Sequence, residues 1–524
     1  MFPVGVWVLC FAIYFICMPK TLSWGLNDYG IDSPEFLTSA MVSSNPHPPG
    51  YPFYSLLLRA FIEIVPFGDS AFRGNLLSVL ISCCTASLVY VLILKITQLC
   101  FKDSGISLAH ISSAIFGVSV YIFCPLVWGT SLITEVYSLN GFLCVLLLLI
   151  FAHTIQKGSR SIVYSVNLLR VFFLLCGLAL ANHLTILAIA VPLIVALLLF
   201  YRNNVGTFLT SCLFIVPGLL FYLYLPIRSV DPHPISWGNP QNLEGFLWML
   251  KGGPYGAYLT DLTVISIGDR MMWGLNTLYT FINPLTLMFV ASGFIHLWER
   301  NRYLFTVLLV SASGFFVYAI LYRTIDAEVN ALPTIIISSI MSGFGIFCTL
   351  RLIKEIKFPP LIINKYTLIK DSFRALSGLF FLFSFIVIFF PFPSNYNDII
   401  AANNDRALMR GKELISSSSH KGIIFLTNEH DVFPSWYVNY VEYPNPHAVP
   451  VAIPLLQYEW YWENTIQKAT GTDIPFEPDL VTAIKRIYEF NRGLKEVFLL
   501  DRSIVSKFRT EPAGILFKIT GVEQ

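Results

Sequence analysis

Apolar residues form long stretches that recur at short intervals up to residue 391. A helix needs about 20 apolar residues to cross a bilayer, because every backbone amide must be satisfied within the segment. The pattern predicts eleven such helices, near residues 2–18, 72–98, 107–126, 138–155, 165–181, 184–200, 206–226, 272–298, 303–321, 333–350 and 374–391. A shorter apolar run, 52–66, carries Arg59 and Glu63, which is typical of an interfacial or half-inserted helix.

The pattern changes after residue 391, where charges become denser and apolar runs shorter. Residues 422–427 and 496–500 are short β-rich runs, and 478–490 has helical periodicity. The sequence therefore predicts a mostly α polytopic membrane protein. We divide it into a transmembrane domain, 1–391, and a small soluble α/β domain, 392–524.

Composition strengthens the membrane interpretation, since 55% of the residues are hydrophobic and only 13% are charged. The lipid bilayer is thus one partner, and nucleic acid is excluded because no basic face accompanies the net charge of +2. Basic residues cluster in alternate loops, which we assign to the cytoplasm. The opposite, outer face receives the C-terminal domain and most of the loop acids, namely Asp28, Asp32, Glu35, Glu135, Asp326 and Glu328.

Cofactor signals are absent from the sequence. None of the ten cysteines has the spacing of a zinc or redox site, so we expect no metal and no cofactor. There is also no glycine loop of the kind that cradles phosphates, which disfavours direct use of a nucleotide sugar.

The first outer loop carries the most informative residues. Asp32 and Glu35 are three residues apart, so both carboxylates could point from one short helix toward one pocket. A carboxylate that is partly desolvated at the membrane surface has a raised pKa, which suits a general base for an acceptor hydroxyl. The same spacing is also an ordinary helix N-cap pattern. The prolines after His47 predict a rigid elbow or a plain helix-entry turn.

These motifs carry a resemblance. Asp32-Ser-Pro-Glu35 followed by His47-Pro-Pro-Gly-Tyr51-Pro resembles the signature of the transmembrane protein 260 family of protein O-mannosyltransferases and its bacterial relatives, within the GT-C superfamily. Further matching motifs occur in order at residues 134–140, 181–183, 224–228, 236–240 and 326–333. The chain departs from the bacterial pattern in the tail, where the usual Gly-Asp-Asn-Asp turn reads Asn428-Glu429-His430-Asp431.

The resemblance implies a GT-C fold and the transfer of a sugar, expected to be mannose, from a polyprenyl or dolichyl phosphate carrier. The acceptor would be Ser or Thr of exported proteins, and the anomeric centre would be inverted. We assign the catalytic residues as Asp32 and Glu35, the donor-phosphate residues as Arg228, Arg323 and His183, and the acceptor- or loop-orienting residues as His47, Tyr51, Glu135, Tyr137 and Trp237. Each also has a structural alternative, such as an arginine that reaches for the interface or an aromatic residue of the interfacial belt.

Two other functions stay open. The same donor chemistry could act on a lipid or a cell-envelope glycan, and a secondary transporter with an outer binding domain is a third class. Transporters commonly show paired repeats and interrupted helices, and the sequence shows neither. The compartment is either a bacterial inner membrane or the endoplasmic reticulum, with the active face and the C-terminal domain periplasmic or lumenal.

Overall fold

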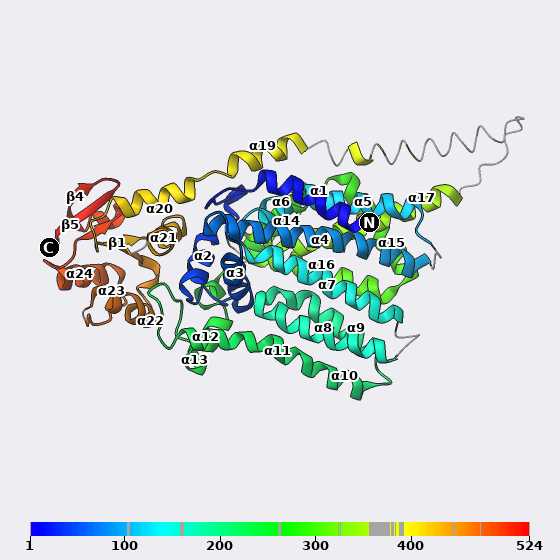
Figure 1. The fold of residues 1–524 in the computed structure, drawn as a ribbon, viewed down its shortest axis with the longest axis horizontal. Helices are drawn as coiled ribbons and strands as arrows, with labels where there is room; N and C mark the ends of the chain where they lie inside the picture. Colours follow the sequence, from blue (N-terminus) through cyan, green and yellow to red (C-terminus); the bar gives the residue numbers. More distant parts are fainter. Residues whose placement is uncertain are drawn as a thin grey trace, which may run out of the picture.

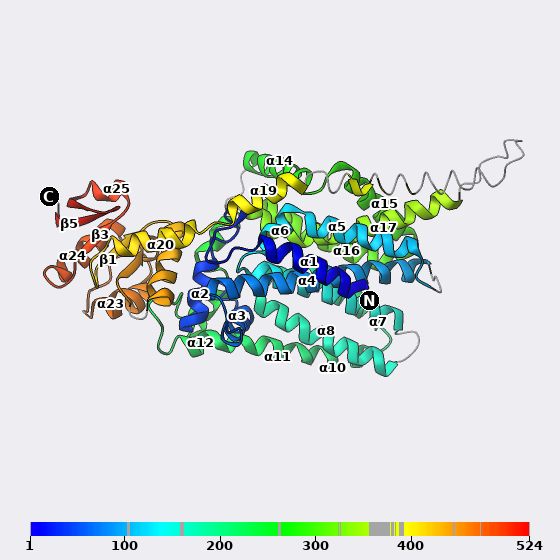
Figure 2. The same cartoon turned by 45° about the horizontal axis from the view of Figure 1, so that its top comes forward.

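The computed structural model describes residues 2–101, 105–157, 162–259, 264–322, 324, 326–355, 378, 382, 384–386, 392–443, 446–471 and 473–522. A bundle of apolar helices occupies most of the length of the molecule, and a small α/β unit lies at one end of it (Figure 1). The same arrangement is visible after a 45° turn (Figure 2). Helices α14 (Val264–Phe281) and α15 (Pro284–Arg300) lie along one side of the bundle, and the run from α10 to α12 (Val205–Arg228) lies along the other.

Six helices within the described residues are long and apolar enough to cross a membrane, or eight if two bent pairs are each one span. The six are α4 (Ser70–Phe101), α7 (Val136–Lys157), α8 (Ile162–Asn182), the run from α10 to α12 (Val205–Arg228), α16 (Arg302–Leu321) and α17 (Leu332–Glu355). Shorter apolar helices are α1 (Phe2–Cys17) and α9 (Leu187–Phe200). The chain thus has the helices of a multi-pass membrane protein, but eleven spans are not confirmed, and most of 374–391 lies outside the described residues.

Two expected spans are bent. Helices α5 (Leu108–Phe123) and α6 (Pro125–Ser131) meet at 65°, and α14 (Val264–Phe281) and α15 (Pro284–Arg300) meet at 100°. The unbroken helix predicted over 272–298 is therefore wrong. Pro284 has no amide hydrogen to continue α14, and the Asn283 side chain accepts a hydrogen bond from the Thr286 amide (2.9 Å), which starts a new helix.

Helix α17 is the central element of the bundle, and the most apolar window of its span is completely buried. It packs against α5, α15 and α16. Glycines allow these close contacts: Gly345 of α17 lies against the Phe289 carbonyl of α15, and Gly343 lies against Gly117 of α5. In lipid the hydrophobic effect does not drive helices together, so they associate through close packing, which small residues at the interface allow.

The outer loops carry two short helices that frame the site described below. Helix α2 (Ser33–Val42) and helix α3 (Pro52–Ile64) both precede α4, and α13 (Leu243–Leu250) follows α12. The 13-residue length of α3 agrees with the short helix expected at 52–66. At the other end of the bundle, the guanidinium groups of Arg300 and Arg351 lie 4.7 and 4.5 Å from the centre of the Phe101 ring.

The C-terminal unit is built on a five-stranded sheet of order β2-β1-β3-β5-β4. Its strands are β1 (Ile423–Leu426), β2 (Val449–Ala452), β3 (Val497–Leu499), β4 (Phe508–Ala513) and β5 (Leu516–Val522). Strand β1 is parallel to β2 and β3, and the remaining pairs are antiparallel. The predicted strands at 422–427 and 496–500 are confirmed as β1 and β3, and the predicted helix is confirmed as α24 (Leu480–Asn491), capped by Asp479.

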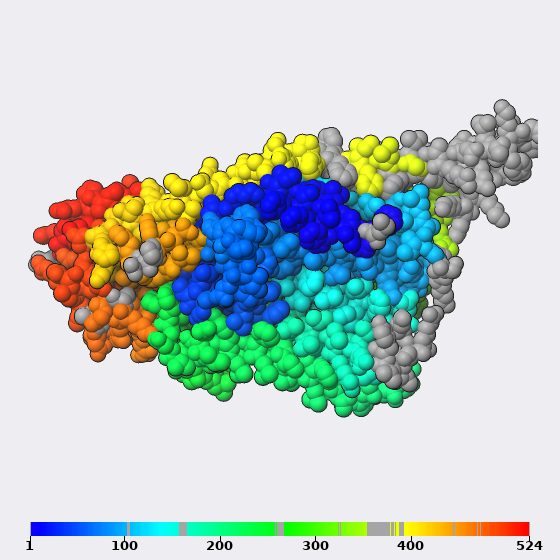
Figure 3. All heavy atoms as spheres, viewed as in Figure 1, coloured from blue at the N-terminus to red at the C-terminus, as the bar shows by residue number. Residues whose placement is uncertain are grey.

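This unit packs directly against the outer end of the bundle. Helix α19 (Phe392–Ala402) leads to it, followed by α20 (Arg406–Ser416) and α21 (Glu429–Tyr437), and α21 contacts α2. Asn403 donates a hydrogen bond to the Cys17 carbonyl (2.7 Å), and Lys468 pairs with Asp231 (2.7 Å). Figure 3 shows the surfaces of the tail and of the outer loops in contact. The division at residue 391 remains a prediction.

Replacing Gly345 with Ala should destabilise the bundle. The added methyl group would overlap the Phe289 carbonyl oxygen, so α15 and α17 must separate, at a cost of about 1–3 kcal/mol. Thermal unfolding in detergent measures the effect. The matched control is Gly206→Ala in α10, where nothing lies within 4 Å, and it should leave Tm unchanged or slightly raised. Equal Tm values for the two variants would contradict this packing.

Candidate active site

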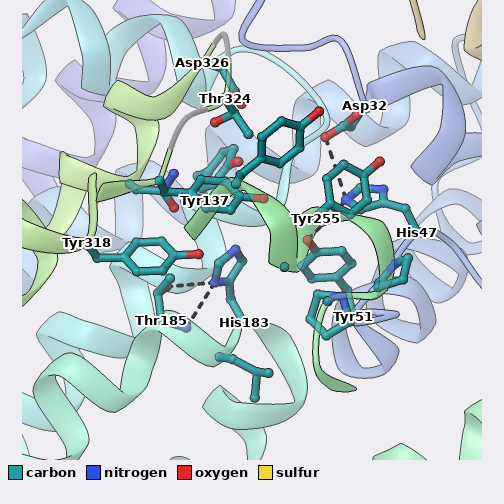
Figure 4. A pocket seen from close by; sticks show the side chains of 18 of the residues that line it. Asp32, His47, Tyr51, Tyr137, His183, Thr185, Tyr255, Tyr318, Thr324 and Asp326 are labelled. Atoms are coloured by element: carbon teal, nitrogen blue, oxygen red, sulfur yellow. Dashed lines mark hydrogen bonds and ion pairs between the residues drawn. The ribbon is translucent and has the colours of Figure 1, made fainter. Parts of the chain in front are cut away.

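A cavity of about 620 Å³ lies between the outer end of the bundle and the C-terminal unit. Its wall includes the apolar residues Leu187 and Ala188 of α9 and Phe315 of α16. The wall is also rich in acids and tyrosines, shown in part in Figure 4, among them Asp28, Asp32, Tyr255, Tyr322, Asp326 and Glu429. Such a cavity can accommodate a ligand that has both an apolar chain and a polyhydroxyl group.

Asp32 lies directly before α2 and lines the cavity. Its backbone carbonyl accepts a hydrogen bond from the Phe36 amide (2.9 Å), but its side chain makes no capping hydrogen bond. The Asp32 carboxyl group therefore does not cap α2, although the spacing of Asp32 and Glu35 is that of an N-cap pattern. The side chain is 21% exposed, and burial raises its pKa well above 3.8, opposed by the nearby His47. A carboxylate of this kind is a stronger base than an exposed one.

Glu35 is completely buried and does not line the cavity. It accepts a hydrogen bond from the His47 amide (2.9 Å), and its carboxylate forms a close ion pair with His47 Nδ1. On the other side of the ring, His47 Nε2 lies 3.2 Å from the Tyr51 hydroxyl and 3.8 Å from Asp32 Oδ2. Glu35 thus positions His47, and direct contact with a substrate, as its expected catalytic role required, is not supported.

His47 carries a positive charge in this setting. Burial lowers its pKa, but the carboxylates of Glu35 and Asp32 outweigh burial and raise it to about 9. Tyr51, which follows the proline elbow, is held in the left-handed region (φ 40°) at the start of α3. This conformation is costly for a side chain other than glycine, and the structure around it must hold it in place.

His183 lines the cavity at the break between α8 and α9. Its Nδ1 accepts hydrogen bonds from the Thr185 amide (3.2 Å) and hydroxyl (2.7 Å), and burial lowers its pKa to about 4. Because a neutral imidazole with an accepting Nδ1 must carry its proton on Nε2, His183 offers one N–H donor. Tyr51 and Tyr137 lie beside the ring and also line the cavity (Figure 4).

Of the two arginines expected to bind the donor phosphate, Arg228 is the one that lies within the described residues. Arg228 is exposed, lies 5.5 Å from the Tyr224 ring and does not line the cavity, so that assignment is not supported. Arg323 lies outside the described residues. The lysine that the described wall contains is Lys251, at the end of α13.

Glu135 and Trp237 lie behind the cavity wall. Glu135 is buried, and neither carboxyl oxygen has a hydrogen-bond partner among the described residues. Its pKa is raised by burial and by the nearby Asp32 and Asp326. Trp237 is buried and packs against His47 and Tyr255, with ring centres 6.3 and 6.2 Å apart. Both residues can shape the site without touching a substrate.

No metal-ligand spacing is visible in the sequence, yet the fold brings three possible ligands together. One ligand atom each of Asp32, Glu35 and His47 lies within 4.8 Å of the others. In this arrangement the Glu35 carboxylate and His47 Nδ1 bind each other, which satisfies both without a metal. The absence of a metal from the site stays a prediction.

Four charged residues of the wall were not assigned to the site from the sequence, namely Asp28, Lys251, Asp326 and Glu429. For Glu429 a signal existed: residues directly after a parallel strand lie at the carboxyl edge of the sheet, where sites form in α/β folds. Asp326 lies directly before the helix that continues as α17. Its pKa is raised, chiefly by burial.

The fold resembles that of ArnT, a protein of known crystal structure. The crystal structure of ArnT from Cupriavidus metallidurans bound to undecaprenyl phosphate superposes with a TM-score of 0.57 and 12% identity, over 98% of this chain and 97% of that chain. The apo structure of the same protein gives a TM-score of 0.55. At this identity the likeness concerns the fold alone.

The family resemblance is confirmed by sequence comparison. Residues 32–207 match the family model for the protein O-mannosyl-transferase TMEM260 N-terminal domain. Protein O-mannosyl-transferase TMEM260 of Mus musculus is 25% identical over 506 residues, which covers 90% of this chain and 65% of the mouse protein. Its Dictyostelium discoideum counterpart is 24% identical over 285 residues, half of this chain and 33% of that protein. The chain thus spans less than two thirds of these relatives.

Replacing His47 with Ala should destabilise the protein more than a double variant does. The single change leaves the Glu35 carboxylate buried without its charged partner, at a cost of about 3–5 kcal/mol. Glu35→Leu combined with His47→Ala removes the unpaired charge and should recover part of the loss. Thermal unfolding of the wild type, His47→Ala, Glu35→Leu and the double variant provides the comparison. A double variant whose Tm loss equals the sum of two single losses would show that the pair is not coupled.

The same pair predicts a pH dependence of stability. The pKa of His47 is 6.5 in an unfolded chain and about 9 in the fold, so the stabilisation is complete below pH 6.5 and is lost as the pH rises through about 9. Wild-type Tm should therefore fall over this window more than the Tm of the double variant. Parallel Tm curves for both proteins would rule out a charged His47.

Proposed function

We propose that this chain transfers a sugar from a polyprenyl-phosphate carrier to a hydroxyl acceptor at the outer face of a membrane. The sugar is mannose and the acceptor is Ser or Thr of exported proteins, as the relatives' names suggest. The observation that carries the proposal is the Asp32 carboxyl group: its side chain makes no capping hydrogen bond to its helix, and it lines a cavity whose wall contains both apolar residues and hydrogen-bonding groups suited to a sugar.

The apolar residues of the wall suit the carrier. Leu187, Ala188 and Phe315 belong to apolar helices of the bundle, so an isoprenoid chain could reach the cavity from the lipid phase. ArnT, which shares the fold, has been crystallised with undecaprenyl phosphate, a carrier of this class. The carboxylates and tyrosine hydroxyls of the wall suit the hydrogen bonding of a sugar.

The transfer needs one base. Asp32 accepts the proton of the acceptor hydroxyl while the oxygen attacks the anomeric carbon of the sugar. The bond from that carbon to the phosphate oxygen breaks, and its electron pair leaves with the carrier phosphate. Because attack and departure occur on opposite faces, the anomeric configuration inverts. Asp32 then returns the proton to water.

The departing phosphate needs donors and positive charge. His183 offers an Nε2 hydrogen, since its Nδ1 is occupied by Thr185. Lys251 offers an ammonium group on the cavity wall, and Arg323 remains a candidate. Positioned donors that receive developing charge commonly supply the largest share of catalysis.

Asp32→Asn should abolish transfer while the protein still folds. Loss of a general base typically costs about 10²–10⁴-fold in rate, and the amide keeps the shape of the side chain. The measurement is transfer of radiolabelled mannose from polyprenyl-phosphate mannose to a threonine peptide by purified protein. Asp231→Asn is the matched control, because Asp231 belongs to the outer loops but pairs with Lys468 away from the cavity. Full activity of Asp32→Asn would end the proposal.

The pH profile offers a second test of the same residue. Only the ionised carboxylate can accept a proton, so kcat/KM should fall as the pH drops through the pKa of Asp32, which lies well above 3.8. The residual activity of Asp32→Asn should lack this acidic limb. An acidic limb that persists in the variant would assign the base to another group.

A further inference from the structure

Glu429 brings the C-terminal unit into the cavity. It is the first residue of α21, three residues beyond Leu426 at the end of β1, and it is the cavity-lining residue that this unit supplies among the described ones. The Tyr255 hydroxyl lies 3.5 Å from Glu429 Oε1, at the limit of a hydrogen bond. The carboxylate therefore faces the same space as Asp32 from the opposite part of the chain.

The position of Glu429 is fixed on both sides. The Asn428 side chain accepts a hydrogen bond from the Asp431 amide (3.0 Å), and the Asp431 carboxylate accepts one from Arg410 Nε (2.7 Å). Next to Glu429, His430 Nε2 lies 3.2 Å from Asp28 Oδ2 of the first outer loop, and its ring packs edge-on against Trp24. These contacts connect the tail to the loop that carries Asp32, so Glu429 is part of the wall and not a loose side chain.

Charge decides which substrate Glu429 can contact. Burial raises the pKa of Glu429, and the nearby His47 partly opposes that rise. A carboxylate repels the phosphate of the donor, so contact with the phosphate is unfavourable. Glu429 belongs to α21 of the C-terminal unit, whereas the apolar residues Leu187, Ala188 and Phe315 of the cavity wall belong to α9 and α16 of the bundle (Figure 1). Both facts favour the acceptor, which arrives from water.

We propose that Glu429 binds the acceptor beside its reacting hydroxyl, so that the C-terminal unit forms the acceptor half of the site and favours neutral or basic acceptor segments over acidic ones. The inference rests on the proposed function. The hydrogen-bond donors it would accept are backbone or side-chain N–H groups and hydroxyls of the acceptor. Asp28, on the same wall, adds to the negative charge.

The test compares Glu429→Gln with wild type on two peptides that carry the same threonine, flanked by lysines in one and by glutamates in the other. The variant should raise KM for the lysine peptide about ten-fold, as expected for a lost hydrogen bond to a charged group. The KM for polyprenyl-phosphate mannose should stay unchanged. The wild-type preference for the lysine peptide should shrink in the variant.

Glu413→Gln is the matched control, because Glu413 lies in α20 of the same unit, pairs with Arg410 at the surface and does not line the cavity. It should behave as wild type. An unchanged peptide preference in Glu429→Gln, or equal rises in KM for donor and acceptor, overturns the inference while an active wild type keeps the proposed function. A wild type that transfers no sugar to either peptide overturns both.

Discussion

The buried ion pair between Glu35 and His47 is the contact on which the geometry of the cavity depends. A charge without a partner is expensive inside a protein, so the pair ties the first turn of α2 to the proline elbow before α3. The second ring nitrogen of His47 then faces Asp32 and the Tyr51 hydroxyl. His47 thus lies close to the Asp32 carboxylate, and the Asp32 side chain makes no capping hydrogen bond to α2.

The charged groups of the cavity would suit the two substrates of the proposed transfer in different ways. Among the described wall residues, Lys251 and the Nε2 hydrogen of His183 suit an anion, while carboxyl groups are supplied by Asp28, Asp32, Asp326 and Glu429. A phosphate would avoid the carboxyl groups and approach the donors. In the proposed transfer, the bond between the carrier phosphate and the sugar would break with its negative charge left on the phosphate. Hydrogen-bond donors and positive groups near the phosphate would stabilise that charge.

Local sequence patterns predicted the elements whose formation depends on residues close together in the chain. The strands at 422–427 and 496–500 and the capped helix α24 were found because period and capping are encoded within a few residues. Asp32 and His47 were placed at one site because they share one loop. Hydropathy could not show that the stretch 272–298 bends, since a break of two residues barely alters an apolar average. Arg228 does not line the described cavity, and the sequence could not show this, because position along the chain does not reveal on which side of α12 a side chain lies.

Glu429 illustrates why a site assembled from distant segments escapes sequence analysis. It follows Asp32 by nearly four hundred residues, and only packing of α21 against α2 brings the two to one wall. The same packing gives the departure from the bacterial turn a physical meaning. In Asn428-Glu429-His430-Asp431, the first residue caps α21, the second enters the cavity, the third binds Asp28 and the fourth binds Arg410. Each of the four side chains either makes a contact or lines the cavity. The turn therefore helps to hold the C-terminal unit against the helix bundle.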